Sequence, residues 1–186
     1  VAEGMNEQGE IVGWARTIEN RQHAFLWTES DGMVDLNNST SLSGWDAGSY
    51  LQSARDINDN GQIVGGAYLN ENGAAYVYSP GAPVVDMTPI VVAGMGGDGD
   101  DLASAEGINN SGDIAGDFVT VPGNYNDGYL LLGDTGEVIP IGLVNGRRTH
   151  AKCITNRVDG VVQVSGVSVE EGSIIYHAFR FTYDTV

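Results

Sequence analysis

The feature that most constrains this chain is a unit of about 50 residues that occurs four times. The copies begin at Ala2, Ala54, Ala105 and Ala151, which places successive starts 52, 51 and 46 residues apart. Each copy opens with a short apolar run and an Asn turn, and a glycine closes that turn at Gly9, Gly61, Gly112 and Gly160. A repeat of this kind indicates stacked copies of one supersecondary unit.

Further apolar runs follow in the same order within each copy. The second runs are Ile11–Gly13, Ile63–Gly65, Ile114–Gly116 and Gln163–Gly166. The third runs are His23–Trp27, Ala74–Tyr78, Asp127–Leu131 and His177–Phe181, and fourth runs occur at Met33–Leu36, Val84–Met87 and Glu137–Ile141. Short runs rich in β-branched and aromatic residues and bounded by Gly, Asn, Asp or Pro predict strands. The Asn-x-x-Gly spacing predicts a tight hairpin whose glycine adopts the left-handed conformation.

One copy is therefore predicted to form a four-stranded antiparallel meander, and strand number and period match propeller blades. We expect an all-β, β-propeller-like fold of one repeat domain, residues 1–186, with blades near 1–50, 51–101, 102–147 and 148–186. The fourth copy lacks a fourth run, so its sheet is one strand short. A four-bladed ring and a partial propeller or arc are both compatible with this pattern. A homodimer that pairs the unpaired edge with another chain is an alternative to the closed ring.

The third runs also carry a family resemblance. His23-Ala24-Phe25 and His177-Ala178-Phe179, preceded by Ile-Asn-x-x-Gly-x-Ile-Val-Gly elements, resemble the HAF repeats of secreted bacterial and archaeal proteins. The signature is degraded at Ala74-Ala75-Tyr76 and at Asp127-Gly128-Tyr129, and the similarity covers essentially the whole chain. The resemblance implies an extracellular, propeller-like repeat protein, and it brings no catalytic residues with it.

Charge and cysteine content exclude several classes of function. The chain has 8 Lys and Arg residues against 25 Asp and Glu residues, a net charge of −17, which excludes a nucleic-acid surface. No apolar stretch is long enough for membrane insertion, and a chain that starts at Val1 is expected to be a processed form or a fragment. The single thiol, Cys153, cannot form an internal disulfide, and its place in a strand predicts a buried, inert core thiol.

Calcium is the one cofactor that the sequence suggests. Asp98, Asp100 and Asp101 lie on a glycine-rich loop and could gather a hard cation, which accepts many oxygen ligands. A second acidic loop begins at Asp56, but Ala67 stands where a calcium loop needs its bidentate Glu. A zinc site built from His23, His177 and His150 would require adjacent first and fourth blades.

The segments between blades predict a ligand-binding face. In a propeller they emerge on one face, and here they carry Trp45, Asp46 and Tyr50, then the acidic loop, then Arg147 and Arg148. Aromatic, acidic and basic groups on one face suit a polar ligand such as a glycan. The alternative is three unrelated surface loops.

No reaction-specific motif is present, so we expect a non-catalytic extracellular binding or scaffolding module for a carbohydrate or protein ligand. Two alternatives stay open. One is a hydrolase or lyase acting on a polysaccharide, and the other is a structural protein whose blades stack into a surface assembly. The acidic, glycine-rich composition and the resemblance predict export from a microbe.

Overall fold

The chain folds into four antiparallel β-sheets that follow one another along the sequence. In the computed structural model, residues 1–39, 41–42, 44–69, 72–99, 101–120, 125–142, 148–169 and 175–185 are described. Sheet 1 contains β1 (Ala2–Met5), β2 (Ile11–Arg16), β3 (Gln22–Thr28) and β4 (Gly32–Asp35), and sheet 2 contains β5 (Tyr50–Ile57), β6 (Ile63–Leu69), β7 (Asn72–Tyr78) and β8 (Val85–Asp86). Sheet 3 contains β9 (Leu102–Ile108), β10 (Ile114–Thr120), β11 (Tyr125–Leu131) and β12 (Val138–Pro140), and sheet 4 contains β13 (Arg148–Ile154), β14 (Val161–Val169) and β15 (Tyr176–Asp184). The predicted all-β class and the three-stranded fourth sheet are confirmed.

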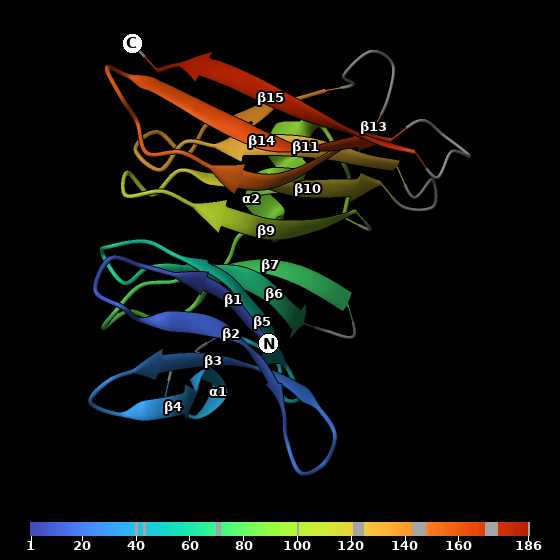
Figure 1. Ribbon diagram of the computed structural model, residues 1–186. Coiled ribbons are helices and arrows are strands. Elements are labelled where there is room, and N and C mark those ends of the chain that lie inside the picture. Colours follow the sequence, from blue (N-terminus) through green and yellow to red (C-terminus); the bar gives the residue numbers. More distant parts are fainter. Residues whose placement is uncertain are drawn as a thin grey trace.

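The sheets form a row, with sheet 1 at one end and sheet 4 at the other (Figure 1). Two short helices lie in the connections, α1 (Leu36–Ser39) after sheet 1 and α2 (Thr88–Met95) after sheet 2. Val91 and Val92 of α2 are buried in the core between sheets 2 and 3. No helix of the described residues has the length and apolarity needed to cross a membrane.

Each sheet has two packing faces, which we name by the neighbour that they contact. The onward face contacts the next sheet. Equivalent pairs of apolar residues occupy it in the first three sheets: Val12 and Leu26, Val64 and Val77, and Ala115 and Leu130. The backward face contacts the preceding sheet and carries Ile57, Ile63 and Tyr76 in sheet 2, at the positions of Ile108, Ile114 and Tyr129 in sheet 3. Three core clusters result, one at each junction between sheets.

The same glycine is required in the second strand of every sheet, at Gly13, Gly65, Gly116 and Gly166. A β-bulge in the first strand brings a carbonyl oxygen against this glycine, so a Cβ on Gly65 would lie 2.0 Å from the oxygen of Ser53. An aromatic ring from the third strand fills the same space, and in sheet 2 the hydroxyl of Tyr76 donates to the Ser53 oxygen at 3.2 Å. The repeated sequence therefore reflects a repeated packing arrangement of the bulge, the glycine and the aromatic ring.

The bulged residues of the four sheets carry alternating charges: Glu3, Arg55, Glu106 and Lys152. Arg55 Nη1 lies 3.9 Å from Glu3 Oε1, and Lys152 Nζ lies 3.3 Å from Glu106 Oε2. Both pairs join neighbouring sheets. Because these side chains are partly exposed, solvent screening keeps their contribution to stability small.

Asparagines at the first turn of each sheet connect the row. In sheet 2, Asn58 Oδ1 accepts the backbone N–H groups of Asn60 and Gln62, which closes the turn, and Gly61 adopts the predicted left-handed conformation with φ of 72°. Asn58 Nδ2 donates to Gln62 Oε1 at 2.8 Å and, across the junction, to the backbone oxygen of Asn109 at 2.8 Å. The buried side chain of Asn58 thereby closes the turn of its own sheet and connects that turn to the first turn of sheet 3.

The same arrangement recurs along the row, and we call it the asparagine ladder. Asn6 Nδ2 donates to the Asn58 oxygen at 3.2 Å, and Asn109 Nδ2 donates to the Thr155 oxygen at 2.9 Å. A second series of bonds runs beside the first, from the backbone N–H groups of Glu7, Asp59 and Asn110 to side-chain oxygens of Asp59, Asn110 and Asn156. The ladder therefore ends at Thr155, which has no amide to donate further.

A half-buried carboxylate, Asp56, and a buried one, Asp117, add further links between sheets. Asp56 Oδ2 accepts the N–H of Ile108 in sheet 3, which gives Asp56 a structural role in joining sheets 2 and 3. Asp117 of sheet 3 accepts the N–H of Ala151 and contacts His150 Nδ1 at 3.0 Å, both in sheet 4. Burial raises the pKa of Asp56 and of Asp117 above the usual range, against the hydrogen bonds that they accept.

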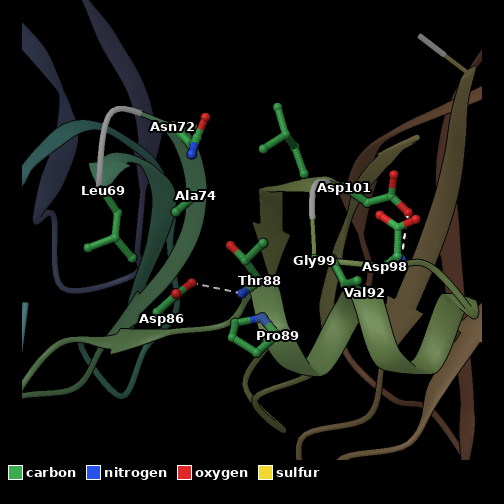
Figure 2. A pocket seen from close by; sticks show the side chains of 12 residues that line it. Leu69, Asn72, Ala74, Asp86, Thr88, Pro89, Val92, Asp98, Gly99 and Asp101 are labelled. Carbon is green, nitrogen blue, oxygen red and sulfur yellow. Dashed lines mark hydrogen bonds between the residues drawn. The ribbon is translucent and has the colours of Figure 1, made fainter. Parts of the chain in front are cut away.

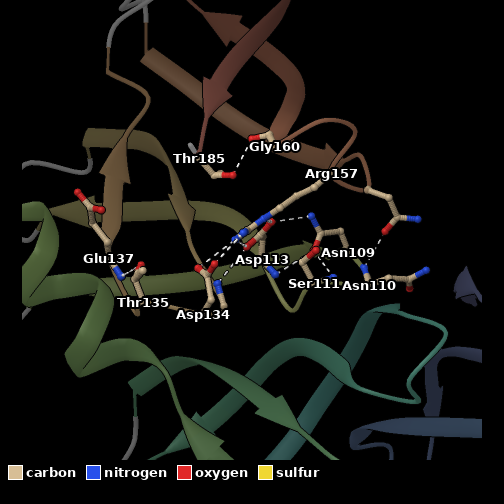
Figure 3. A network of polar contacts seen from close by, with 12 residues as sticks. Asn109, Asn110, Ser111, Asp113, Asp134, Thr135, Glu137, Arg157, Gly160 and Thr185 are labelled. Atoms are coloured by element: carbon tan, nitrogen blue, oxygen red, sulfur yellow. Dashed lines mark hydrogen bonds and ion pairs between the residues drawn. The ribbon is translucent and has the colours of Figure 1, made fainter.

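An arginine between two carboxylates connects sheets 3 and 4 (Figure 3). Arg157 Nε donates to Asp113 Oδ2 at 2.7 Å, and its Nη1 donates to Asp134 Oδ2 at 2.8 Å. Burial raises the pKa of Asp113, but hydrogen bonds from Arg157, from the Gly133 N–H and from Asn109 outweigh burial and place the pKa below the usual range. The ionised form of Asp113 is therefore the form that stabilises the fold.

Two sequence-based expectations are wrong. Cys153 is exposed, because its position faces the next sheet in sheets 1 to 3 and sheet 4 is the last of the row. His23 Nδ1 contacts Asp35 Oδ2 of the same sheet at 2.8 Å. The zinc alternative is also wrong, because sheets 1 and 4 lie at opposite ends of the row (Figure 1).

We predict that Asn58→Asp destabilises the protein by about 2 kcal/mol, since the carboxylate keeps the two turn hydrogen bonds and loses the two that Nδ2 donates. Urea unfolding followed by circular dichroism measures this loss. Asn20→Asp is the matched control, because it adds the same charge at an exposed turn outside the ladder. Equal destabilisation by both variants would contradict the role of the ladder.

We predict that Asp113→Asn costs about 3 kcal/mol at pH 7, because it leaves Arg157 without its buried partner. Because the pKa of Asp113 is lowered in the folded state, its contribution is present above the ordinary aspartate pKa of about 3.9 and is lost as the pH falls through the folded value. The difference between wild type and variant should therefore shrink below about pH 4. Asp134→Asn, at an exposed carboxylate, should have a much smaller effect, and a constant difference at all pH values would contradict this account.

Candidate functional site

A cavity lies between sheet 2 and the segment that leads into sheet 3 (Figure 2). Its volume is about 550 Å³. Leu69, Asn72 and Ala74 line the sheet 2 side, and Val92 and Leu102 belong to α2 and β9 on the other side. The cavity thus has apolar walls at the end of an interface between sheets, where small molecules commonly bind.

Polar groups enter the cavity from three connected segments. Asp86 ends β8 and holds the start of α2, since its Oδ1 accepts the Thr88 N–H at 2.9 Å. Asp98 and Asp101 lie on the loop after α2, where Asp101 Oδ2 accepts the Asp98 N–H at 2.9 Å (Figure 2). Two of the three residues predicted to bind calcium therefore line this cavity, together with Asn72 and Thr88.

The loop with Asp98 and Asp101 is held close to the sheet by a helix end and a glycine. Helix α2 ends at Gly96 with φ of 75°, and the Gly97 N–H donates to the Val92 oxygen at 2.9 Å. A Cβ on Gly97 would lie 2.4 Å from Asp101 Oδ2 and 2.6 Å from the Phe118 ring. Gly97 thus allows Asp101, which is 7% exposed, to pack beside the Phe118 ring.

The repeat explains why the cavity opens at this sheet. Asp35 of sheet 1 and Asp86 of sheet 2 occupy equivalent positions and accept the same type of backbone N–H, from Asn37 and Thr88. In sheet 1, His23 contacts Asp35, whereas Ala74 stands at the position of His23 in sheet 2. The hollow beside His23 and Asp35 measures only about 210 Å³. The smaller side chain therefore leaves space in front of Asp86.

A cluster of rings lies between sheets 1 and 2. The Tyr50 ring is 5.6 Å from the His23 ring and 5.4 Å from the Tyr68 ring, and the Arg21 guanidinium lies 5.6 Å from the Tyr50 centroid. Tyr68 and Leu69 are neighbours on β6, and Leu69 lines the cavity. The ring cluster and the cavity therefore lie at the same end of β6.

The other predicted ligand-binding residues are distributed as follows. Trp45 is half-buried and packs against the core between sheets 1 and 2, and Asp46 is exposed beside it. Arg148 is half-buried at the start of β13, and Arg147 lies outside the described residues. Of the five predicted residues, the structure brings Tyr50 into the ring cluster.

The calcium prediction stays a prediction. Asp100 lies outside the described residues, and elsewhere in the described chain no group of three or more His, Cys, Asp or Glu side chains is arranged to hold a metal ion. Sequence reasoning missed Asn72, Asp86 and Thr88 at the cavity. The signal that the sequence offers is that Asp86 repeats Asp35 in the fourth runs.

Comparisons with known proteins identify no family for this chain. No family model matches it, and no curated protein matches it. Among solved structures it is similar to a mutant of AofleA from Arthrobotrys oligospora in which three arginines are replaced by alanine, with 11% sequence identity and a TM-score of 0.41. The alignment covers 97% of this chain and 57% of that chain, so the chain spans little more than half the length of that protein.

We predict that Gly97→Ala displaces the loop at Asp101 and costs roughly 1–3 kcal/mol, since the added methyl group overpacks the contact with Phe118. Gly99→Ala is the matched control on the same loop, because a Cβ there meets nothing within 4 Å. Thermal unfolding measures the stability, and hydrogen exchange of the loop measures the displacement. Equal behaviour of the two variants would contradict the close packing of this wall.

Proposed function

We propose that this protein is a non-catalytic binding module for a polar ligand of the carbohydrate class, and that the ligand occupies the cavity between sheets 2 and 3. The observation that carries the proposal is the composition of the cavity wall. Asn72, Asp86, Thr88, Asp98 and Asp101 supply oxygen and nitrogen atoms, while Leu69, Ala74, Val92 and Leu102 supply apolar surface.

This combination suits a sugar for a physical reason. A sugar ring presents hydroxyl groups that donate to carboxylates, and C–H groups that pack on apolar side chains. With a net charge of −17, the protein repels anionic ligands, so a neutral or cationic glycan fits better than an acidic one. The ring cluster around Tyr50, at the same end of β6, offers an aromatic surface for further units of a longer ligand.

We also propose the finer description of fold and origin. The four sheets would be blades of a partial propeller or arc that belongs to the HAF-repeat family and is exported by a microbe. The bulge and the glycine with its overlying ring occur in every sheet, and the asparagine ladder occurs at every junction. These repeated features support equivalent blades. The His-Ala-Phe signatures of β3 and β15 support the family.

A polysaccharide hydrolase or lyase is the second candidate. Asp86, Asp98 and Asp101 line one cavity, and pairs of carboxylates are what glycoside hydrolysis uses. Calcium at the Asp98–Asp101 loop would serve either function. The homodimer through the free edge of β15 and the stacked surface assembly also stay predictions.

The test is binding of the labelled chain to a glycan array, repeated with calcium and with a chelator. We expect Asp86→Ala to weaken binding at least tenfold, because it removes a carboxylate from the cavity wall. Glu29→Ala, which removes the same charge from an exposed turn, should leave binding unchanged.

The same array distinguishes the alternatives. Release of sugar ends by the wild type, lost in Asp86→Ala or Asp101→Ala, would favour the hydrolase or lyase. Equal binding by Asp86→Ala and Glu29→Ala would place the ligand elsewhere. Absence of binding to every glycan would contradict the carbohydrate class.

A further inference from the structure

The two ends of the row of sheets differ in chemistry, although both are left without a neighbouring sheet. At the sheet 1 end the backward face is apolar and carries Met5, Ile11, Trp27 and Met33. Met5 is 67% exposed, whereas Ile57 and Ile108 at the same position in sheets 2 and 3 are 4% and 5% exposed. The backward face of sheet 1 therefore has the composition of a buried junction without its cover.

At the sheet 4 end the onward face is polar. Ser165 and Arg180 are exposed at the positions where Val64 and Val77 of sheet 2 pack on the next sheet. The exposed Cys153 lies on the same face, where Asp56 of sheet 2 reaches sheet 3. A polar outer face is what terminates arrays of stacked repeats.

The asparagine ladder shows the same asymmetry. The backbone oxygens of Asn58 and Asn109 each accept two hydrogen bonds, one from the glycine of their own turn and one from the preceding asparagine. Among the described residues, the backbone oxygen of Asn6 accepts only the Gly9 N–H. Glu7 occupies the position of Asp59, whose carboxylate accepts an N–H from the preceding turn, but within the described residues the Glu7 carboxylate has no such partner. Sheet 1 thus presents unused acceptors, while Thr155 at the other end offers no amide donor.

We propose that the backward face of sheet 1 binds a further sheet of this same repeat, one with Val or Leu on its onward face and Asn in its first turn. The occupant follows from continuity with the three existing junctions, each of which joins such a face to a backward face. Sheet 4 of a second copy does not fit, because Ser165, Arg180 and Thr155 stand where the apolar groups and the amide are needed.

The test supplies such a sheet from the chain itself. A second copy of residues 50–86 is joined to Val1 through a second copy of the connecting segment 36–49, and the rest of the chain is unchanged. The readout is the rate at which hydrogen peroxide oxidises Met5, measured by mass spectrometry. We expect the added sheet to slow this oxidation at least tenfold, whereas Met87, already 8% exposed, serves as the internal reference.

Two matched fusions separate docking from mere attachment. In the first, the added copy carries Asn58→Thr, Val64→Ser and Val77→Arg, which give it the onward face of sheet 4, and Met5 should react as fast as in the unfused chain. In the second, the unaltered copy follows Thr185 and Val186, and neither Met5 nor Cys153 should gain protection.

The proposal would be overturned if Met5 were oxidised as fast in the fusion with the unaltered copy before Val1 as in the unfused chain. It would also be overturned if the altered copy protected Met5 equally well. Protection of Met5 in the unfused chain that grows with protein concentration would show that a second copy covers this face instead. This outcome would also overturn the proposal. The result of the glycan array does not depend on any of these three oxidation outcomes.

Discussion

The buried asparagine at the first turn of sheets 1 to 3 is the interaction on which the rest of this structure depends. Its carboxamide offers one strong acceptor and two donor hydrogens, and in this position all are used: Oδ1 closes the hairpin, one N–H contacts the side chain that ends the turn, and the other reaches the next sheet. Local turn geometry and the distance between sheets are therefore set by the same group. The onward and backward faces then meet in register, and the apolar side chains between them become buried.

Much of the fold could be predicted from the sequence because the repeated residues are ones that particular turns and strand contacts require. Asn58 and Gly61 identify a tight turn, and Gly65 followed eleven residues later by Tyr76 identifies two paired strands. The number of sheets, their strand order and the missing strand of sheet 4 follow from counting such runs. The boundaries and contacts of the connecting segments cannot be predicted in this way, because these segments have no counterpart in the other copies.

The errors arose where a residue's environment depends on its place in the row. Cys153 occupies a position that faces the next sheet, so its exposure depends on whether a next sheet exists, which local pattern does not reveal. The candidate site shows the same limit. The acidic loop was visible in the sequence, but Asp86 and Thr88 approach it through α2, and the space between them opens because Ala74 replaces a histidine. A repeat therefore predicts the framework best at the positions where copies agree, and the candidate cavity lies where one copy departs.

The position of the ladder at the turns has a consequence for how such a chain can change over evolutionary time. Contact between consecutive sheets is made chiefly by the turn and the two packing faces. The segment that runs from the last strand of one sheet to the first strand of the next can therefore vary wherever its side chains lie outside the core. Here one such segment contains α1, another contains α2 with the cavity loop, and a third is short. Duplication or loss of sheet 2 or sheet 3 would preserve the type of every junction, and new binding surfaces can be gained by inserting residues between units without unfolding the array.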